Sequence, residues 1–530
     1  MPNTSMAASA PQSPSARSYF LPLLLVATAV SRWLCWESFI SGLDSGNYWL
    51  GIGDFSIANE RPHAPGYPVF ILFCRAAGWL TGDQHHSLLL VVTLLSVAAV
   101  WVSYRLAMEL FNQLAARTTA LLLACNPLFF LYGITAENYA FDALCSSLLI
   151  LLGLRAGRGG AAWLWFGVAV GVSIGFRGTS VILLAPALAC VLLHQWRAGG
   201  FRRQALASLL GGLLAGVACW LPWAVAEEGG VWSYLHAATN LSPTSAGTFL
   251  GNLAVFAIAG FWGMNIAWGY LAFRWKSFAH FRFRHFTFRR ALLWCWVFPI
   301  VLFFALVIYA KGYALLILPA CSMAVAWLAA NEPSRWRRIG VVGGMVAANL
   351  AIFLLLPYRL PPYFTALAPQ NRTAEQRAES VVGRGFSVLL PTLSRVRAND
   401  KLVGDGLELI DRATWGREDS ALVVIDPAAQ MLLVGRVAQV YRPRLRIAVP
   451  STFRRNAVVV LHGVDWEERR GSDADFNSPQ IILLTRNELA EKYLEIGGTL
   501  LEQQAPFALL KFSREQGYRL RQQIDQLFTR

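Results

Sequence analysis

Long apolar runs recur along the first 357 residues of this 530-residue chain, and short loops that contain arginines separate them. Most of these runs have about 18–22 residues, the length at which a helix crosses the hydrocarbon core of a bilayer. The pattern predicts eleven membrane-spanning helices. They are expected near residues 19–36, 87–106, 117–134, 138–154, 161–176, 179–195, 204–225, 248–273, 291–309, 312–330 and 339–357.

Two segments beside the first predicted spans need separate interpretation. The apolar segment 66–80 is too short for a span and contains Arg75, so we expect a juxtamembrane or re-entrant helix against the outer face. Residues 1–18 are polar and of low complexity, which predicts a disordered cytoplasmic tail. A cleaved signal peptide is the alternative. We favour an uncleaved first span because the later spans need its orientation.

The pattern changes after residue 357. Apolar runs shorten to five or six residues and alternate with helix-like stretches, which indicates a small α/β domain over residues 358–530. Its polar stretch 369–420 is expected to link the two parts or to pack over the membrane part. Asp426 and His462 end predicted strands and are interpreted as structural. The chain thus divides into the tail 1–18, a membrane module 19–357 with an outer loop 37–86, and the domain 358–530.

The composition supports a polytopic membrane protein. Hydrophobic residues make up 55% of the chain and charged residues 15%, against roughly 45–50% and 25% in soluble domains. These values exclude a soluble enzyme, a coiled coil, a disulfide scaffold and a disordered chain. All eight cysteines precede residue 358 and none forms C-x-x-C, so neither a structural zinc motif nor a redox motif is present. The sequence predicts no cofactor and leaves a divalent-metal requirement open.

The net charge of +15 reflects membrane topology. The first 357 residues hold 22 Lys and Arg against 11 Asp and Glu, and 17 of those 22 basic residues fall in alternate loops. This positive-inside pattern predicts a cytoplasmic N-terminus, and an odd number of spans then leaves residues 358–530 outside. We expect a bacterial inner membrane with this domain in the periplasm. Membrane lipids are therefore expected partners, and nucleic acid is not.

Two acidic residues follow outward-going spans. Asp44 lies just past the first membrane exit, and a proline-rich stretch follows it at residues 63–68. Glu137 lies in a second outer connection. A carboxylate beside apolar surface suits a general base because it takes up a proton more readily there. The alternative is that both acids only cap helices at the interface.

The residues around these acids form an ordered set of short motifs: D-S-G at 44–46, H-x-P-G-Y-P at 63–68, and N-P-x-F followed by A-E-x-Y-A within 126–140. In this order and on one side of the membrane, the set resembles the GT-C superfamily of multi-spanning glycosyltransferases, and within it the protein O-mannosyltransferase-like branch. The resemblance covers roughly residues 20–330. Asn47 stands where the family usually has Glu, and Ala64 where it usually has the first proline.

The resemblance implies an α-helical polytopic fold of GT-C type that carries the C-terminal α/β domain. It implies transfer of a sugar, with mannose expected, from a polyprenyl-phosphate carrier to an acceptor hydroxyl on the outer face, such as a protein Ser or Thr. Asp44 would be the catalytic base and Glu137 the second acid. In-line attack on the anomeric carbon predicts inversion. The residues that would line the substrate pocket are His63, Tyr67, Asn47, Tyr139 and Tyr313.

Two basic residues lie on the side that otherwise lacks them. Arg177 and Lys311 fall in predicted outer turns between spans, where they could bind the carrier's phosphate. The alternative is snorkelling to lipid headgroups. Asp142, five positions after Glu137, points roughly 140° away from it on a helix, which predicts a buried polar contact instead of a catalytic role.

Other functions fit parts of the pattern. The same chemistry could act on a lipid or polysaccharide acceptor. A lipid-linked sugar transporter or flippase would place polar, broken helices at the bilayer midplane, often in repeated halves. Here the acids and the proline-rich loop gather at the outer boundary and no repeat is visible, which favours an enzyme. A mere membrane anchor would not need eleven spans.

Overall fold

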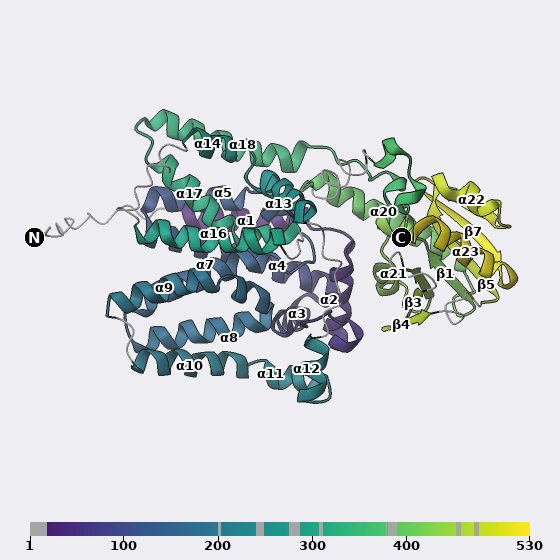
Figure 1. The fold of residues 1–530 in the computed structure, drawn as a ribbon, viewed down its shortest axis with the longest axis horizontal. Helices are drawn as coiled ribbons and strands as arrows, with labels where there is room; N and C mark the ends of the chain where they lie inside the picture. The colour runs from purple at the N-terminus through teal and green to yellow at the C-terminus, as the bar shows by residue number, and fades with distance from the viewer. Residues whose placement is uncertain are drawn as a thin grey trace, which may run out of the picture.

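The computed structural model describes residues 19–199, 203–239, 249–274, 287–306, 311–377, 379, 390–451, 457–470, 476 and 478–529. The predicted disordered tail 1–18 lies outside these residues. A large bundle of helices lies beside a smaller domain built on a sheet, which packs at one end of the bundle (Figure 1). This arrangement confirms the predicted fold class of a helical membrane part followed by an α/β domain.

Every predicted span overlaps one helix or two consecutive helices. Among the described residues, five segments are long and apolar enough to cross a membrane: Gln84–Leu110, Ala161–Leu183, Arg203–Glu227, Phe288–Leu306 and Arg335–Leu355. The bundle consists of α1 (Phe20–Cys35), α4 (Gln84–Leu110), α5 (Gln113–Ala124), α6 (Pro127–Leu131), α7 (Ala140–Ala156), α8 (Gly160–Leu183), α9 (Ala185–Arg197), α10 (Arg203–Ala218), α11 (Leu221–Glu227), α13 (Phe249–Met264), α14 (Ile266–Phe273), α16 (Phe288–Leu306), α17 (Leu318–Ala330) and α18 (Arg335–Leu355).

Several spans are interrupted at polar residues. The backbone of Arg177 leaves the helical conformation inside α8, with φ −164° and ψ 85°, which confirms the predicted break between two spans. Asn126 separates α5 from α6, and Asn265, with φ 35°, separates α13 from α14. Each break frees backbone groups that need partners inside the bundle.

The outer loop forms short helices across the end of the bundle that faces the sheet domain (Figure 1). They are α2 (Leu43–Gly53), the 3-10 helix η1 (Ile57–Asn59) and α3 (Pro68–Thr81). α3 packs against α4 and α8, while Trp79 at its end is 90% exposed. The prediction of a separate short helix over 66–80 is therefore confirmed.

The C-terminal domain contains a seven-stranded mixed sheet with the order β4-β3-β2-β1-β5-β7-β6. β1 runs parallel to β2 and β5, and the other pairs are antiparallel. The strands are β1 (Ala421–Ile425), β2 (Arg446–Pro450), β3 (Ala457–His462), β4 (Asp465–Arg470), β5 (Gln480–Arg486), β6 (Thr499–Gln504) and β7 (Phe507–Ser513). The helices include α20 (Leu393–Thr414), α21 (Gly435–Tyr441), α22 (Ala490–Leu494) and α23 (Gly517–Phe528). α20, within the polar stretch 369–420, packs against α18, β6 and β7.

Asp426 directly follows the central strand β1 and is fully buried. One carboxylate oxygen accepts a hydrogen bond from the backbone N–H of Ala429 at 2.8 Å. The other accepts from the hydroxyls of Thr485 and Tyr493. These bonds fit the interpretation of Asp426 as a structural residue, because they join two strands and a helix.

Replacing Asp426 by asparagine tests the energetics of this buried carboxyl. Burial raises the pKa of Asp426 from 3.8 to about 6, so between these pH values the folded protein holds a proton that the unfolded chain has released. The free energy of unfolding should therefore fall by about 3 kcal/mol as pH rises through this window. At higher pH this carboxyl group should add no further pH dependence to the free energy of unfolding. Asp426→Asn should remove that contribution, measured as a smaller loss of Tm between about pH 4 and pH 7. A loss equal to that of the unmodified protein would contradict this account.

Candidate functional site

Asp44 lies in the first turn of α2, where a negative charge is favoured by the helix dipole. Its side chain is 38% exposed, and its Oδ1 lies 3.6 Å from Nδ1 of His63. Nε2 of His63 in turn lies 3.1 Å from the Tyr67 hydroxyl. Asp44 can therefore meet an incoming group from solvent while His63 and Tyr67 stand beside it.

The proline-rich loop owes its conformation to a glycine. Gly66 has φ +99°, and a Cβ at this position would lie 2.4 Å from a side-chain carbon of Ile57. Tyr67 is also left-handed, with φ 49°, a strained conformation that costs on the order of 1 kcal/mol and is typical of functional loops. The P-G-Y-P motif thus turns the chain sharply and directs Tyr67 toward His63.

Glu137 reaches the beginning of α2 from the connection between α6 and α7. A Cβ placed on Gly42, which caps α2, would lie only 3.3 Å from Oε1 of Glu137. Asp44 follows Gly42 by two positions. The two predicted acids therefore come from separate connections between helices and lie at the same end of α2.

Glu37, which the sequence analysis did not select, holds the Glu137 connection in place. Its Oε1 accepts a hydrogen bond from the backbone N–H of Ala136 at 2.7 Å, and its own N–H donates to the carbonyl of Ile134 at 3.1 Å. His85 lies 3.9 Å from the same carboxylate. Burial raises the pKa of Glu37. No sequence signal pairs Glu37 with residue 136, because the contact exists only after the helices pack.

Arg177 is buried beside the two acidic connections and is 2% exposed. Its guanidinium donates to Oδ1 of Asn138 at 2.7 Å and lies 3.5 Å from Oδ1 of Asp142. The rings of Tyr139 and Tyr313 lie 4.2 and 4.8 Å from its central carbon. The predicted buried contact of Asp142 is confirmed. The positive charge of Arg177 is thus already shared with a carboxylate and two aromatic faces.

An aromatic cluster connects the loop residues with the buried arginine. Tyr48 on α2 packs edge-on against Tyr67 at 5.4 Å between ring centres, and Tyr139 packs edge-on against Tyr313 at 5.7 Å. Burial raises the pKa of the Tyr48 and Tyr67 hydroxyls, so both remain protonated donors. Tyr48 was not predicted from the sequence, although its spacing of four from Asp44 places it on the same side of a helix.

Two predicted residues remain: the side chain of Lys311 is not described, and Asn47 contacts the C-terminal domain. Lys311 begins the 3-10 helix η3 (Lys311–Leu316), and its side chain lies outside the described part of the chain. The next residue, Gly312, touches Tyr139: a Cβ there would lie 2.2 Å from the ring. Asn47 is 1% exposed, and its Oδ1 accepts a hydrogen bond from Arg436 of the C-terminal domain at 2.8 Å. The pocket role of Asn47 stays a prediction.

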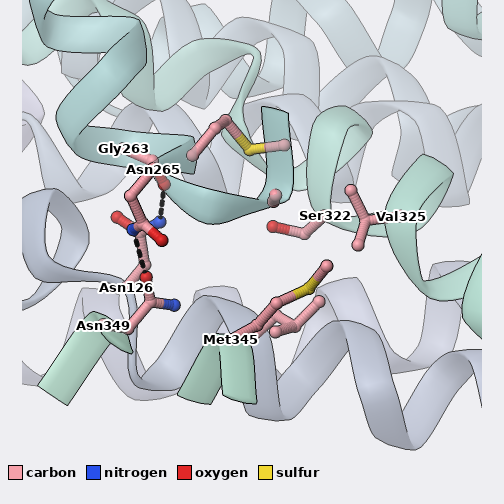
Figure 2. A pocket seen from close by; sticks show the side chains of 10 residues that line it. Asn126, Gly263, Asn265, Ser322, Val325, Met345 and Asn349 are labelled. Atoms are coloured by element: carbon pink, nitrogen blue, oxygen red, sulfur yellow. Dashed lines mark hydrogen bonds between the residues drawn. The ribbon is translucent and has the colours of Figure 1, made fainter. Parts of the chain in front are cut away.

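A second polar cluster lies deeper in the bundle, where two helix breaks meet (Figure 2). Asn126 caps α6 by accepting from two backbone N–H groups and donates to the carbonyl of Gly263. Asn265 caps α14 and donates to Asn349 on α18. The cavity between them measures about 10 Å³, which holds at most one water. The capping of α6 by Asn126 accounts for the asparagine of the N-P-x-F motif. The cavity is too small for a sugar.

The described acidic and metal-ligating side chains can be compared with the needs of a bound ion. No group of three or more His, Cys, Asp or Glu side chains in those ranges is arranged to hold an ion. Glu137 lines a small cavity of about 20 Å³ that it shares with Glu37 and with Arg395 of α20.

Comparison with known proteins identifies the fold. ArnT from Cupriavidus metallidurans in the apo state superposes with a TM-score of 0.59 at 13% identity, over 94% of this chain and 98% of that chain. The same protein bound to undecaprenyl phosphate gives 0.57 at 15% identity, over 93% and 98%. The two chains share one fold. The coverage extends into the C-terminal domain, and the predicted fold of a helical membrane part followed by an α/β domain is confirmed.

The sequence comparisons cover less of the chain. A family model described as dolichyl-phosphate-mannose-protein mannosyltransferase matches residues 62–224. This range contains His63, Tyr67, Glu137 and Arg177 but begins after Asp44. A comparison with curated proteins found no match.

The buried ion pair of Arg177 and Asp142 can be tested by removing one partner and then both. Arg177→Met leaves the Asp142 carboxylate buried without its cation and should lower the free energy of unfolding by about 3–5 kcal/mol. Adding Asp142→Asn removes the uncompensated charge and should restore most of the loss. Thermal unfolding of the purified proteins measures both effects. A single variant as stable as the unmodified protein would show that the pair does not hold this region.

Proposed function

We propose that this protein transfers a sugar from a polyprenyl-phosphate carrier to an acceptor hydroxyl on the outer face of the membrane. Mannose and a protein Ser or Thr are the proposed sugar and acceptor. The observation that carries the proposal is that Asp44 and Glu137 lie at the same end of α2, while Tyr139, two residues after Glu137, contacts the buried Arg177. The fold shared with a protein that binds undecaprenyl phosphate and the match to a mannosyltransferase family model support a lipid-linked donor.

Asp44 would act as the general base. In one step the acceptor oxygen attacks the anomeric carbon, its proton passes to the Asp44 carboxylate, and the bond from the anomeric carbon to the phosphate oxygen breaks. The polyprenyl phosphate leaves with the bonding electrons, and the configuration inverts. The partial exposure of Asp44 lets a hydroxyl approach. Glu137, at the same end of α2, is the residue proposed to orient the acceptor or the sugar.

The leaving phosphate needs positive charge beside it as the bond breaks. Arg177 and Lys311 are the proposed cations. Gly312 touches Tyr139, whose ring also contacts Arg177, so the backbone of η3 brings Lys311 close to the same cluster. Because Arg177 is already paired with Asp142, we assign the phosphate contact mainly to Lys311. The proposed role of Arg177 is to fix the rings of Tyr139 and Tyr313.

The Asp44→Asn variant tests the assigned base. The amide cannot take the acceptor proton, so kcat should fall by about 10²–10⁴-fold with an unchanged fold. The measurement is transfer of labelled mannose from polyprenyl-phosphate mannose to a Ser/Thr peptide, with a lipid extract as a parallel acceptor. Asp54→Asn is the matched control, because Asp54 lies at the other end of α2, where it pairs with Arg61 at 2.9 Å. It should keep at least half of the activity. Transfer by Asp44→Asn at the rate of the control would remove Asp44 from the mechanism.

The proposed orientation places the N-terminus in the cytoplasm and residues 358–530 outside. Alkaline phosphatase fused after residue 530 should be active in bacterial cells, because this enzyme matures only in the oxidising periplasm. A green fluorescent protein fused at the same point should be dark if it is exported unfolded. The reverse pattern would place the sheet domain in the cytoplasm and the proposed acceptor side with it.

A further inference from the structure

The C-terminal domain binds the helix that carries Asp44. α21 of the domain packs against α2, and Arg436 is the central contact. Its guanidinium donates to Oδ1 of Asn47 at 2.8 Å and to the carbonyl of Asn59 at 3.0 Å. Within the domain it donates to Gln439 at 2.9 Å. One buried side chain thus joins α2, the loop after it and the sheet domain.

The burial of Arg436 makes these bonds strong constraints. The residue is 4% exposed, and burial lowers the pKa of its guanidinium to about 10. Its hydrogen-bond acceptors are two amide side chains and main-chain carbonyls, whose directions are fixed by helix and loop. The absence of a side chain at Gly46 admits the stem of Arg436, since a Cβ there would lie 3.1 Å from Cγ of the arginine. A buried charge with fixed partners cannot shift without losing charge-assisted hydrogen bonds.

The domain also holds the chain on the other side of Asp44. The Asp400 carboxylate accepts hydrogen bonds from the backbone N–H groups of Ser38 and Phe39 at 2.8 and 3.1 Å. The Tyr441 hydroxyl accepts from the N–H of Ile40 at 3.0 Å. The segment that enters α2 is therefore fixed before the helix begins, and Arg436 fixes the helix itself.

We infer that Arg436 is a positioning residue that sets the place and rotation of α2, so that Asp44 faces the reacting groups. The inference rests on the proposed role of Asp44. Asn47 follows Asp44 by three positions, so the two side chains lie within roughly 60° of each other around the helix. A movement that releases Asn47 from Arg436 must also move the Asp44 carboxylate. The C-terminal domain is then part of the catalytic unit.

Kinetics of Arg436 and Asn47 variants test this inference. Arg436→Ala should lower kcat by about 10–100-fold, because small displacements of a reacting group cost this much, while KM for donor and acceptor should change less than about twofold. Asn47→Ala should have a similar effect, and the double variant should be no worse than Arg436→Ala. Asn47→Asp, which still accepts from the guanidinium, should be more active than Asn47→Ala when Arg436 is present and less active when it is absent. Additive effects in the double variant would overturn the inference.

Hydrogen exchange of α2 gives a readout that does not depend on activity. Arg436→Ala should speed exchange in peptides covering residues 43–53 and leave the bundle helices unchanged. Arg442→Ala is the matched control, because Arg442 directly follows α21 but pairs with Asp411 inside the domain, and it should alter neither exchange in α2 nor kcat. A rise in the acceptor's KM at constant kcat would assign the contact to acceptor binding and overturn positioning. If the unmodified protein transfers no sugar, the proposed function fails, and the exchange data alone decide whether Arg436 fixes α2.

Discussion

Inside a bundle of apolar helices a polar backbone group has no water to bind, so each helix break must be closed by another part of the protein. The structure meets this constraint with side chains from distant segments. Asn126 and Asn265 close the breaks of α6 and α14 and join α18 through Asn349. At Arg177 the guanidinium connects the broken helix to the segment after Glu137 through Asn138 and Asp142. The breaks therefore act as ties between helices and not as hinges.

This constraint also determines where the acids lie. The connection that carries Glu137 ends at a packed aromatic cluster on one side and is bonded by Glu37 on the other. Its position is consequently fixed by the bundle. The connection that carries Asp44 is tied to the bundle at its beginning by Glu37, and the segment that follows is fixed by polar contacts with the sheet domain. The two acids thus meet at a junction between the two parts of the chain.

The membrane spans and the break at Arg177 can be predicted from the sequence. Length and hydropathy locate the spans, and the break at Arg177 follows from a charged residue between two apolar runs. The contact between Arg436 and Asn47 joins residues 389 positions apart, and neither residue has a pattern that points to the other. Asn47 could be recognised as unusual only through the resemblance, which expects an acid there. α20, in contrast, has apolar residues at helical spacing within its polar sequence. The buried ones include Val396, Leu402, Val403 and Leu407. This spacing is enough to predict the helix from the sequence.

α2 itself shows why its position depends on contacts from other parts of the chain. A helix of eleven residues is marginal in water, and the interior glycines Gly46 and Gly51 each cost about 1 kcal/mol relative to alanine. Both glycines are places of close approach: Gly46 admits Arg436, and a Cβ on Gly51 would lie 2.9 Å from Pro62. The two glycines therefore lower the intrinsic stability of the helix and allow contacts with other segments that fix its position. Because α2 is stabilised by those contacts, the position of Asp44 depends on how the C-terminal domain packs against this helix.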